Sequence, residues 1–269
     1  MIAKPLFLDS ITDSGINSAG RIVLSGSHGG VYPAALASNS GIRGVIFNDA
    51  GIGFEKAGIA GVSQLADIGM AAAALDCHSC RIGSAYDAFT RGRVSIVNVI
   101  ANTYGVKTGM SATEALDLLA EAPLPRSTLP PAREARCEAI LPYSERRVLL
   151  LDSASLVVPG DTGKIVVTGS HGGLVGGDPR RALKAHACVG VFNDAGVGID
   201  NIGITRLPVL DQCEVAAVTV SCKTARIGDA ASALETGVIS YVNKTAKALG
   251  ALIGTELKAW LENLSDKIG

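Results

Sequence analysis

Charge is scarce in this sequence. Asp, Glu, Lys and Arg make up 18% of the 269 residues, and the formal net charge is −1. A chain without excess positive charge creates no general field that would hold a polyanion, so we expect no nucleic-acid partner. Hydrophobic residues make up 48% of the sequence, a share that argues against disorder and predicts a globular protein.

Long apolar runs and secretion signals are missing as well. Gly, Asp or Asn breaks each apolar run well short of the roughly 20 residues that a membrane-spanning helix needs, which predicts no membrane partner. The first ten residues carry one basic residue and then meet Asp9, so we recognise no signal peptide and expect a cytoplasmic location. The six cysteines form no even framework of the kind found in small secreted domains, and we expect reduced thiols.

What the sequence does contain is an internal repeat. Ile-Val-Leu-Ser-Gly-Ser-His-Gly-Gly, ending at Gly30, recurs as Ile-Val-Val-Thr-Gly-Ser-His-Gly-Gly, ending at Gly173. Phe-Asn-Asp-Ala-Gly begins at Phe47 and again at Phe192, and from there one register of matches holds to the end of each copy. So many ordered matches indicate a duplication.

The duplication defines the expected domains. Residues 1–122 form repeat one and residues 148–269 form repeat two. Residues 123–147 hold five of the ten prolines, and we interpret them as a Pro-rich linker that neither pairs into a sheet nor continues a helix.

Each repeat has the pattern of an α/β unit. In repeat one, short apolar runs, most of them β-branched, predict strands at 22–25, 45–47, 71–75 and 94–97, and Ala- and Leu-rich stretches predict helices at 33–38, 59–68 and 112–120. Alternating strands and helices indicate the α/β class, here two tandem, pseudo-symmetric repeats with mainly parallel sheets. Ligands of such sheets bind beyond the carboxyl ends of the strands, where the repeated motifs of both copies fall.

The duplicated Gly-Ser-His-Gly-Gly loop is the clearest candidate site. Ser27 and Ser170 could be nucleophiles or polarisers, and His28 and His171 could be bases; because neighbouring side chains diverge, a Ser–His couple would form across the copies. The glycine N–H groups could bind an anion or oxyanion. The alternative is a tight structural turn with a capping serine. The candidate substrate-binding glycines of this loop are Gly29, Gly30, Gly172 and Gly173.

The Phe-Asn-Asp-Ala-Gly segment ends the next strand of each copy. Asn48 and Asn193 could orient a substrate, while Asp49 and Asp194 could orient a histidine or act as bases. Asn and Asp before glycine are also ordinary turn residues.

A third segment differs between the copies. Asp76-Cys-His-Ser-Cys-Arg81 corresponds to Ser221-Cys-Lys-Thr-Ala-Arg226, and because the second copy has lost most of the potential ligands we expect no metal site. Arginine is present in both copies, as Arg81 and Arg226. Its guanidinium could bind a carboxylate or phosphate, or it could hold neighbouring loops together.

Other polar residues of these segments have structural interpretations. Cys77 and Cys222 are expected to be small buried residues at strand ends. Asn98 and Asn243 are expected to cap helices. His186, which has no counterpart, is expected on the surface of a helix.

Three functions fit these motifs. The first is a hydrolase of a small anionic or cyclic amide or ester-type substrate, with the serines, histidines and aspartates as catalytic groups. The second is an isomerase or racemase that uses mirrored acid and base groups from the two repeats, and the third is an anion-binding module without catalysis. We expect no cofactor, a small-molecule partner and, because the chain is apolar and rich in glycine, a homo-oligomer.

The motif also carries a resemblance. Ser25-Gly-Ser-His-Gly-Gly30 in tandem α/β repeats resembles the ring-opening amidohydrolases that cleave cyanuric acid and barbiturate. That family uses serine–lysine pairs in three repeats, whereas this chain has two repeats and no lysine at an equivalent position in both. The resemblance implies hydrolysis of a cyclic amide or a similar bond.

Overall fold

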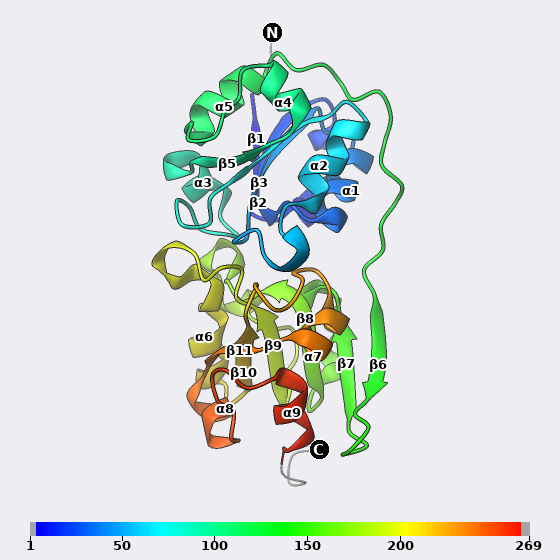
Figure 1. Ribbon diagram of the computed structural model, residues 1–269, viewed down its shortest axis with the longest axis vertical. Coiled ribbons are helices and arrows are strands. Elements are labelled where there is room, and N and C mark those ends of the chain that lie inside the picture. Colours follow the sequence, from blue (N-terminus) through cyan, green and yellow to red (C-terminus); the bar gives the residue numbers. More distant parts are fainter. Residues whose placement is uncertain (1–3, 265–269) are drawn as a thin grey trace.

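The protein is an α/β structure with one mainly parallel sheet in each repeat, as the sequence predicts. The computed structural model describes residues 4–264 (Figure 1). Sheet one holds its strands in chain order: β1 (Leu6–Leu8), β2 (Ile22–His28), β3 (Gly44–Asn48), β4 (Ala71–Leu75) and β5 (Val94–Val97). β1 to β4 are parallel and β5 is antiparallel to β4.

Sheet two repeats this order and adds one strand. Its elements are β7 (Arg147–Leu151), β8 (Ile165–His171), β9 (Val189–Asn193), β10 (Ala216–Val220) and β11 (Ile239–Val242). β6 (Arg136–Ile140) pairs antiparallel with β7 at the sheet edge. The expectation that no part of 123–147 joins a sheet is therefore wrong, because the prolines stop at Pro131 and resume at Pro142, leaving a proline-free stretch able to donate its N–H groups.

Helices cover both faces of each sheet. In repeat one α1 (Val31–Asn39) and α2 (Ala60–Asp67) pack on one face, and α3 (Ala85–Arg91), α4 (Val99–Thr103) and α5 (Ala112–Leu119) pack on the other. In repeat two α6 (Arg206–Gln212) packs on one face, and α7 (Ala230–Thr236), α8 (Lys244–Ala248) and α9 (Leu257–Glu262) pack on the other. Burial on both faces explains why most residues of the parallel strands are apolar, apart from the polar ends of β2 and β8.

The repeats differ after their second strand. Repeat one has helix α1 there, whereas the described part of repeat two has two single-turn 3₁₀ helices, Val175–Gly177 and Pro179–Arg181. Gly176 and Gly177 both have positive φ, a conformation that does not continue an α-helix. His186 follows this irregular segment and lies in an exposed loop, not in the expected helix, with its Nε2 2.7 Å from the Cys213 carbonyl oxygen.

Most expected elements are present. The strands at 71–75 and 94–97 have the expected bounds, and the other predicted strands and helices overlap observed ones. Asn98 and Asn243 accept hydrogen bonds from Ala101 and Ala246 and cap α4 and α8, which confirms the capping interpretation. No helix in the described part of the chain is long and apolar enough to cross a membrane.

The two repeats meet at the loops that follow their strands. Gly51 packs against Gly196, so that a Cβ added at Gly51 would lie 2.8 Å from the Gly196 Cα. Two equivalent hydrogen bonds flank this contact, from Phe54 N–H to the Cys222 carbonyl at 2.6 Å and from Ile199 N–H to the Cys77 carbonyl at 2.9 Å. The contact is therefore pseudo-twofold, and it turns the strand ends of the repeats toward each other (Figure 1).

Candidate functional site

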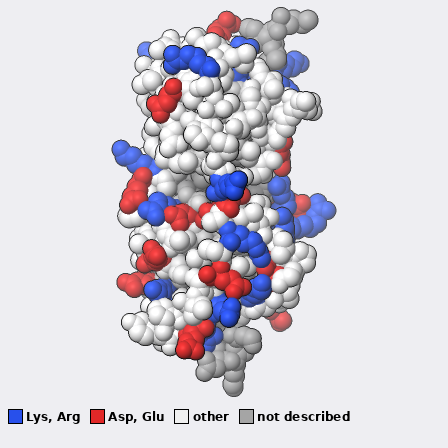
Figure 2. Space-filling model, turned by 90° about the vertical axis from the view of Figure 1, so that its right-hand side faces the viewer, with Lys and Arg blue, Asp and Glu red and all other residues white. Residues whose placement is uncertain are grey.

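A pocket of about 670 Å³ lies between the repeats, and the duplicated serine–histidine loops of both line it. Ser27 and His28 come from the end of β2, while Ser170 and His171 come from the end of β8. The expected convergence of the two loops is thus present. On the face in Figure 2, charged side chains gather where the repeats meet and over repeat two.

Each serine hydroxyl is held by a backbone amide. Ile11 N–H donates to Ser27 Oγ at 3.0 Å, and Ala154 N–H donates to Ser170 Oγ at 2.9 Å. Each hydroxyl can still donate its own proton. No hydrogen bond joins a serine to a histidine across the repeats among residues 4–264, so the expected Ser–His couple is not formed.

The two histidines are neutral donors. Gly30 N–H donates to His28 Nδ1 at 3.1 Å, and Gly173 N–H donates to His171 Nδ1 at 3.2 Å. A nitrogen that accepts carries no proton, so each neutral ring has its proton on Nε2. Burial lowers the pKa of His28 to about 4 and that of His171 to about 3, with the Arg206 charge also lowering the latter. At neutral pH each ring can therefore donate a hydrogen bond from Nε2 and has no free nitrogen to act as a base.

The loop glycines have a packing role. Gly29 N–H donates to the Asn48 carbonyl at 3.1 Å and Gly172 N–H donates to the Asn193 carbonyl at 2.8 Å. The amides of Gly30 and Gly173 hold the histidines, so all four amides have partners within the fold. These amides are therefore not free to bind an oxyanion.

The Asn and Asp of the second motif fix turns. Asp49 Oδ1 accepts from the N–H groups of Gly51 and Cys77, and Ser95 donates to Oδ2. Asp194 Oδ1 likewise accepts from Gly196 and Cys222. Neither carboxylate lines the pocket, and the turn interpretation therefore fits them better than the catalytic one.

The two asparagines have the same kind of role. Asn48 Oδ1 accepts from Ala50 N–H at 2.9 Å, and Asn193 Oδ1 accepts from Ala195 N–H at 2.9 Å. Both side chains are buried and donate from Nδ2 to a backbone carbonyl in their own repeat. They too lie outside the pocket lining.

The cysteines next to these turns are poor nucleophiles. Burial and Asp49 raise the pKa of the Cys77 thiol far above its usual range, and burial and Asp194 raise that of Cys222 to about 12. Thiols are reactive mainly as thiolates. Both cysteines are buried, as the sequence predicts.

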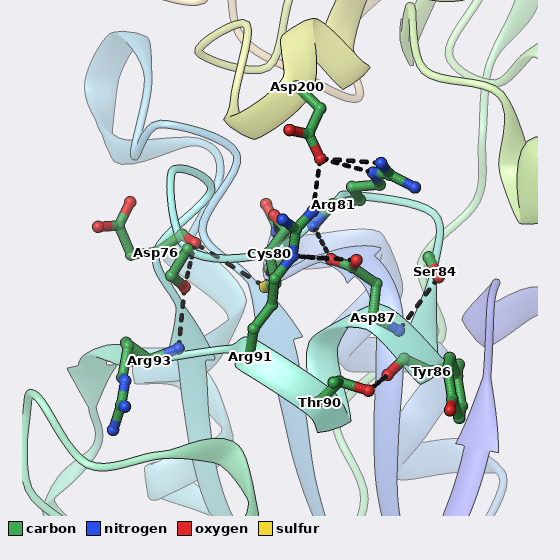
Figure 3. Close-up of polar contacts among 12 residues, drawn as sticks. Asp76, Cys80, Arg81, Ser84, Tyr86, Asp87, Thr90, Arg91, Arg93 and Asp200 are labelled. Atoms are coloured by element: carbon green, nitrogen blue, oxygen red, sulfur yellow. Dashed lines mark hydrogen bonds and ion pairs between the residues drawn. The ribbon is translucent and has the colours of Figure 1, made fainter.

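Arg81 and Arg226 tie the repeats together. Arg81 pairs with Asp200 at 2.9 Å, and Arg226 pairs with Glu55 at 2.7 Å. Arg91 also reaches Asp200 and completes the polar cluster in Figure 3. These mirrored ion pairs match the loop-tying interpretation, because each guanidinium already has a carboxylate.

One set of potential metal ligands occurs in the described chain. Ligand atoms of Asp76, Cys77 and His78 lie within 4.8 Å of one another. The Cys77 thiol is held protonated by burial, and Asp76 Oδ1 already accepts from His78 N–H. We assign no metal to this set.

Sequence reasoning missed Glu134, which belongs to the linker and has no repeat counterpart. This half-buried carboxyl lines the pocket, near enough to the side chains of Tyr32 and Ser153 to interact with both. Burial raises the pKa of Glu134. A carboxyl of raised pKa in a pocket is suited to general acid–base catalysis.

Arg206 is the second residue that sequence reasoning missed. Its side chain lines the pocket and is 4% exposed. Nε donates to the Gly173 carbonyl at 3.1 Å, Nη1 donates to the carbonyls of Arg181 and Ala182, and the guanidinium lies 5.1 Å from the Phe192 ring centroid. The available signal was a break in the repeat, because Gly61 stands at the matching position of repeat one.

Comparisons with protein-family models, curated proteins and solved structures find no match to this chain. The resemblance to the ring-opening amidohydrolases therefore depends on the short motif and the tandem architecture alone.

Proposed function

We propose that this protein is a hydrolase of a small cyclic amide or ester-type substrate, bound in the pocket between the repeats. The observation that carries the proposal is the pair of neutral histidines, His28 and His171, each with its proton on Nε2, in one pocket with Glu134. Buried N–H donors of this kind stabilise the negative charge that develops on a carbonyl oxygen during hydrolysis.

The proposed reaction uses water as the nucleophile. Glu134 accepts a proton from a water molecule as the water oxygen attacks the carbonyl carbon. The carbonyl oxygen becomes an oxyanion that accepts hydrogen bonds from imidazole N–H groups and from the free protons of Ser27 and Ser170. Collapse of this intermediate breaks the bond to nitrogen or oxygen, and Glu134 returns its proton to the leaving group.

This mechanism differs from a serine nucleophile for a structural reason. Neither Ser27 nor Ser170 has a base as hydrogen-bond partner, and the nearby imidazoles have their free nitrogen occupied by a glycine amide. A serine hydroxyl without a base is a weak nucleophile. The serines therefore suit the role of donors better.

The two alternatives make different demands on the pocket. An isomerase or racemase with mirrored groups needs an acid or base from each repeat, whereas Glu134 comes from the linker and the mirrored histidines are donors. A binding module needs only the donors. Hydrolysis is the function that uses both kinds of group.

Replacing Glu134 tests the proposal. Turnover is first sought with a panel of lactones, imides, carboxylic esters and cyclic amides. We then expect Glu134→Gln to lower kcat about 100-fold or more, with little change in KM, because the variant keeps the shape but loses the base. Glu235→Gln, at an exposed position of α7, is the matched control and should behave as wild type.

Other outcomes would contradict this mechanism. Wild-type kcat in Glu134→Gln, with activity abolished in Ser27→Ala or Ser170→Ala, would indicate a serine nucleophile. Solvent deuterium entering the substrate without hydrolysis would indicate an isomerase. Ligand-induced stabilisation without turnover across the panel would leave the binding module.

The cytoplasmic location and the homo-oligomeric state expected from the sequence remain predictions. The proposed chemistry itself uses side chains and water.

A further inference from the structure

Arg206 is a buried cation without a carboxylate partner. In the described part of the chain no Asp or Glu lies within ion-pair distance of it, and its polar contacts there are three backbone carbonyls. The Nη2 group makes no hydrogen bond to a described residue. A charge that is removed from water normally has a counter-charge, because desolvation is costly.

Further positive charge surrounds this guanidinium. Arg181 and Lys184 line the same pocket, and neither forms an ion pair within residues 4–264. Lys184 Nζ donates instead to the Ser155 carbonyl at 2.5 Å. Arg181 lies near enough to Arg206 for the two like charges to interact. This wall of the pocket therefore has an excess of positive charge.

Three of the five carboxylates that line the pocket are engaged elsewhere. Asp152 accepts two backbone amides, from Ala135 and Ala230. Glu55 and Asp229 both pair with Arg226. The other two carboxylates of the described lining, Asp13 and Glu134, form no ion pair with Arg206.

Repeat one cannot form the same wall. Gly61 occupies the position of Arg206, and a Cβ there would lie 2.2 Å from the Gly30 carbonyl oxygen and 2.4 Å from the Ala34 Cβ. Helix α1 thus fills the space in repeat one, whereas repeat two lacks this helix and has room for a long side chain. The positive wall therefore occurs once in the described chain.

We infer that Arg206, with Arg181 and Lys184, binds an oxyanion group of the substrate, a carboxylate or a phosphate, beside the carbonyl that His171 polarises. Gly173 connects the two functions, since its carbonyl accepts from Arg206 Nε at 3.1 Å and its N–H donates to His171 Nδ1 at 3.2 Å. Because both side chains contact Gly173, the guanidinium of Arg206 and the imidazole of His171 can bind an anionic group and a carbonyl group of the same small substrate. The position of the carbonyl rests on the proposed function, while anion binding can be measured without turnover.

Anion binding to the whole protein tests this inference. Calorimetric titrations with sodium malonate, inorganic phosphate and uncharged malonamide would measure the three affinities. We expect one site per chain for malonate or phosphate and no measurable binding of malonamide. Arg206→Lys should weaken anion binding about tenfold or more, because lysine cannot keep the same donors in place. Arg43→Lys is the matched control, since Arg43 also donates to two backbone carbonyls, of Gly20 and Ala122, but lies outside the pocket lining.

A second variant keeps the test valid if Arg206→Lys fails to fold. Arg181→Gln combined with Lys184→Gln changes only exposed side chains and should weaken anion binding several-fold. Wild-type anion affinity in both the Arg206 and the double variant would overturn the inference, as would equal binding of malonamide and malonate. Anion binding that depends on Arg206 in a protein without hydrolytic activity would support the oxyanion site and count against the proposed function alone.

Discussion

At the scale of single residues, the chemistry of the pocket depends on which atom of each side chain is already occupied. His28 and His171 accept a glycine N–H two residues ahead, and this local contact fixes the tautomer that faces the pocket. Ser27 and Ser170 also accept a backbone amide, so they too face the pocket as donors. The site is therefore rich in donors, which suits an oxygen-rich ligand.

The neutral histidines predict a pH dependence of stability. Because folding lowers their pKa values from 6.5 to about 4 and about 3, the unfolded chain takes up protons that the native state does not. Stability should fall as pH drops below about 6.5, on the order of 2 kcal/mol per histidine by pH 4.5. Urea unfolding at a series of pH values would measure this slope.

Histidine variants separate this effect from that of the carboxylates. His28→Gln and His171→Gln should each give a flatter slope between pH 6.5 and about 4.5, since glutamine does not titrate. His186→Gln, at an exposed loop position, should leave the slope unchanged. A wild-type slope in both pocket variants would show that these histidines are not held neutral.

At the scale of elements, the site depends on close packing at the ends of β2 and β8. Gly83 N–H donates to the Gly26 carbonyl at 2.8 Å, and Gly228 N–H donates to the Gly169 carbonyl at 2.7 Å. The loop before α3 or α7 is thereby held against the strand that carries the serine and histidine. A side chain on either strand glycine would separate the two.

Gly26→Ala tests this packing. An added Cβ would lie 2.6 Å from Ser84 N and 2.7 Å from the Asp9 carbonyl oxygen, and both are backbone atoms that cannot move independently. We expect a loss of about 2 kcal/mol or more in the free energy of unfolding by urea. The control is Gly15→Ala, where no atom lies within 4 Å. Equal stabilities of the two variants would contradict the packing argument.

At the scale of the whole molecule, the pocket exists because the strand-end loops of the two repeats meet. Gly51 and Gly196 form the centre of the contact, and the Arg81–Asp200 and Arg226–Glu55 pairs flank it as mirror equivalents. The five-residue cluster of Ala50, Ile82, Ala195, Ile202 and Ile227 adds an apolar core between the repeats. This arrangement joins two sheets that each have their own apolar core.

Gly51→Ala should disturb the contact between the repeats. Its Cβ would lie 2.8 Å from the Gly196 Cα, and the residue has φ +72°. Gly109→Ala is the control because Gly109 has φ +87° but no atom within 4 Å, so it carries the backbone strain without the clash. We expect a lower urea midpoint for Gly51→Ala than for the control, and faster reaction of Cys77 and Cys222 with a thiol reagent. Equal thiol reactivity in the two variants would show that the repeats tolerate the added methyl group.

The sequence by itself determined the duplicated α/β unit, its main strands and the strand-end loops with Ser27, His28, Ser170 and His171, because periodicity and repeated motifs are local properties of the chain. Tertiary structure alone decided which polar atoms have no hydrogen-bond partner within the fold and can contact a ligand. It gave Asp49, Arg81 and their counterparts partners within the fold, and it brought Glu134 and Arg206 into the pocket. Neither of these two belongs to a repeated motif, and the burial of each arises from contacts between segments distant in sequence.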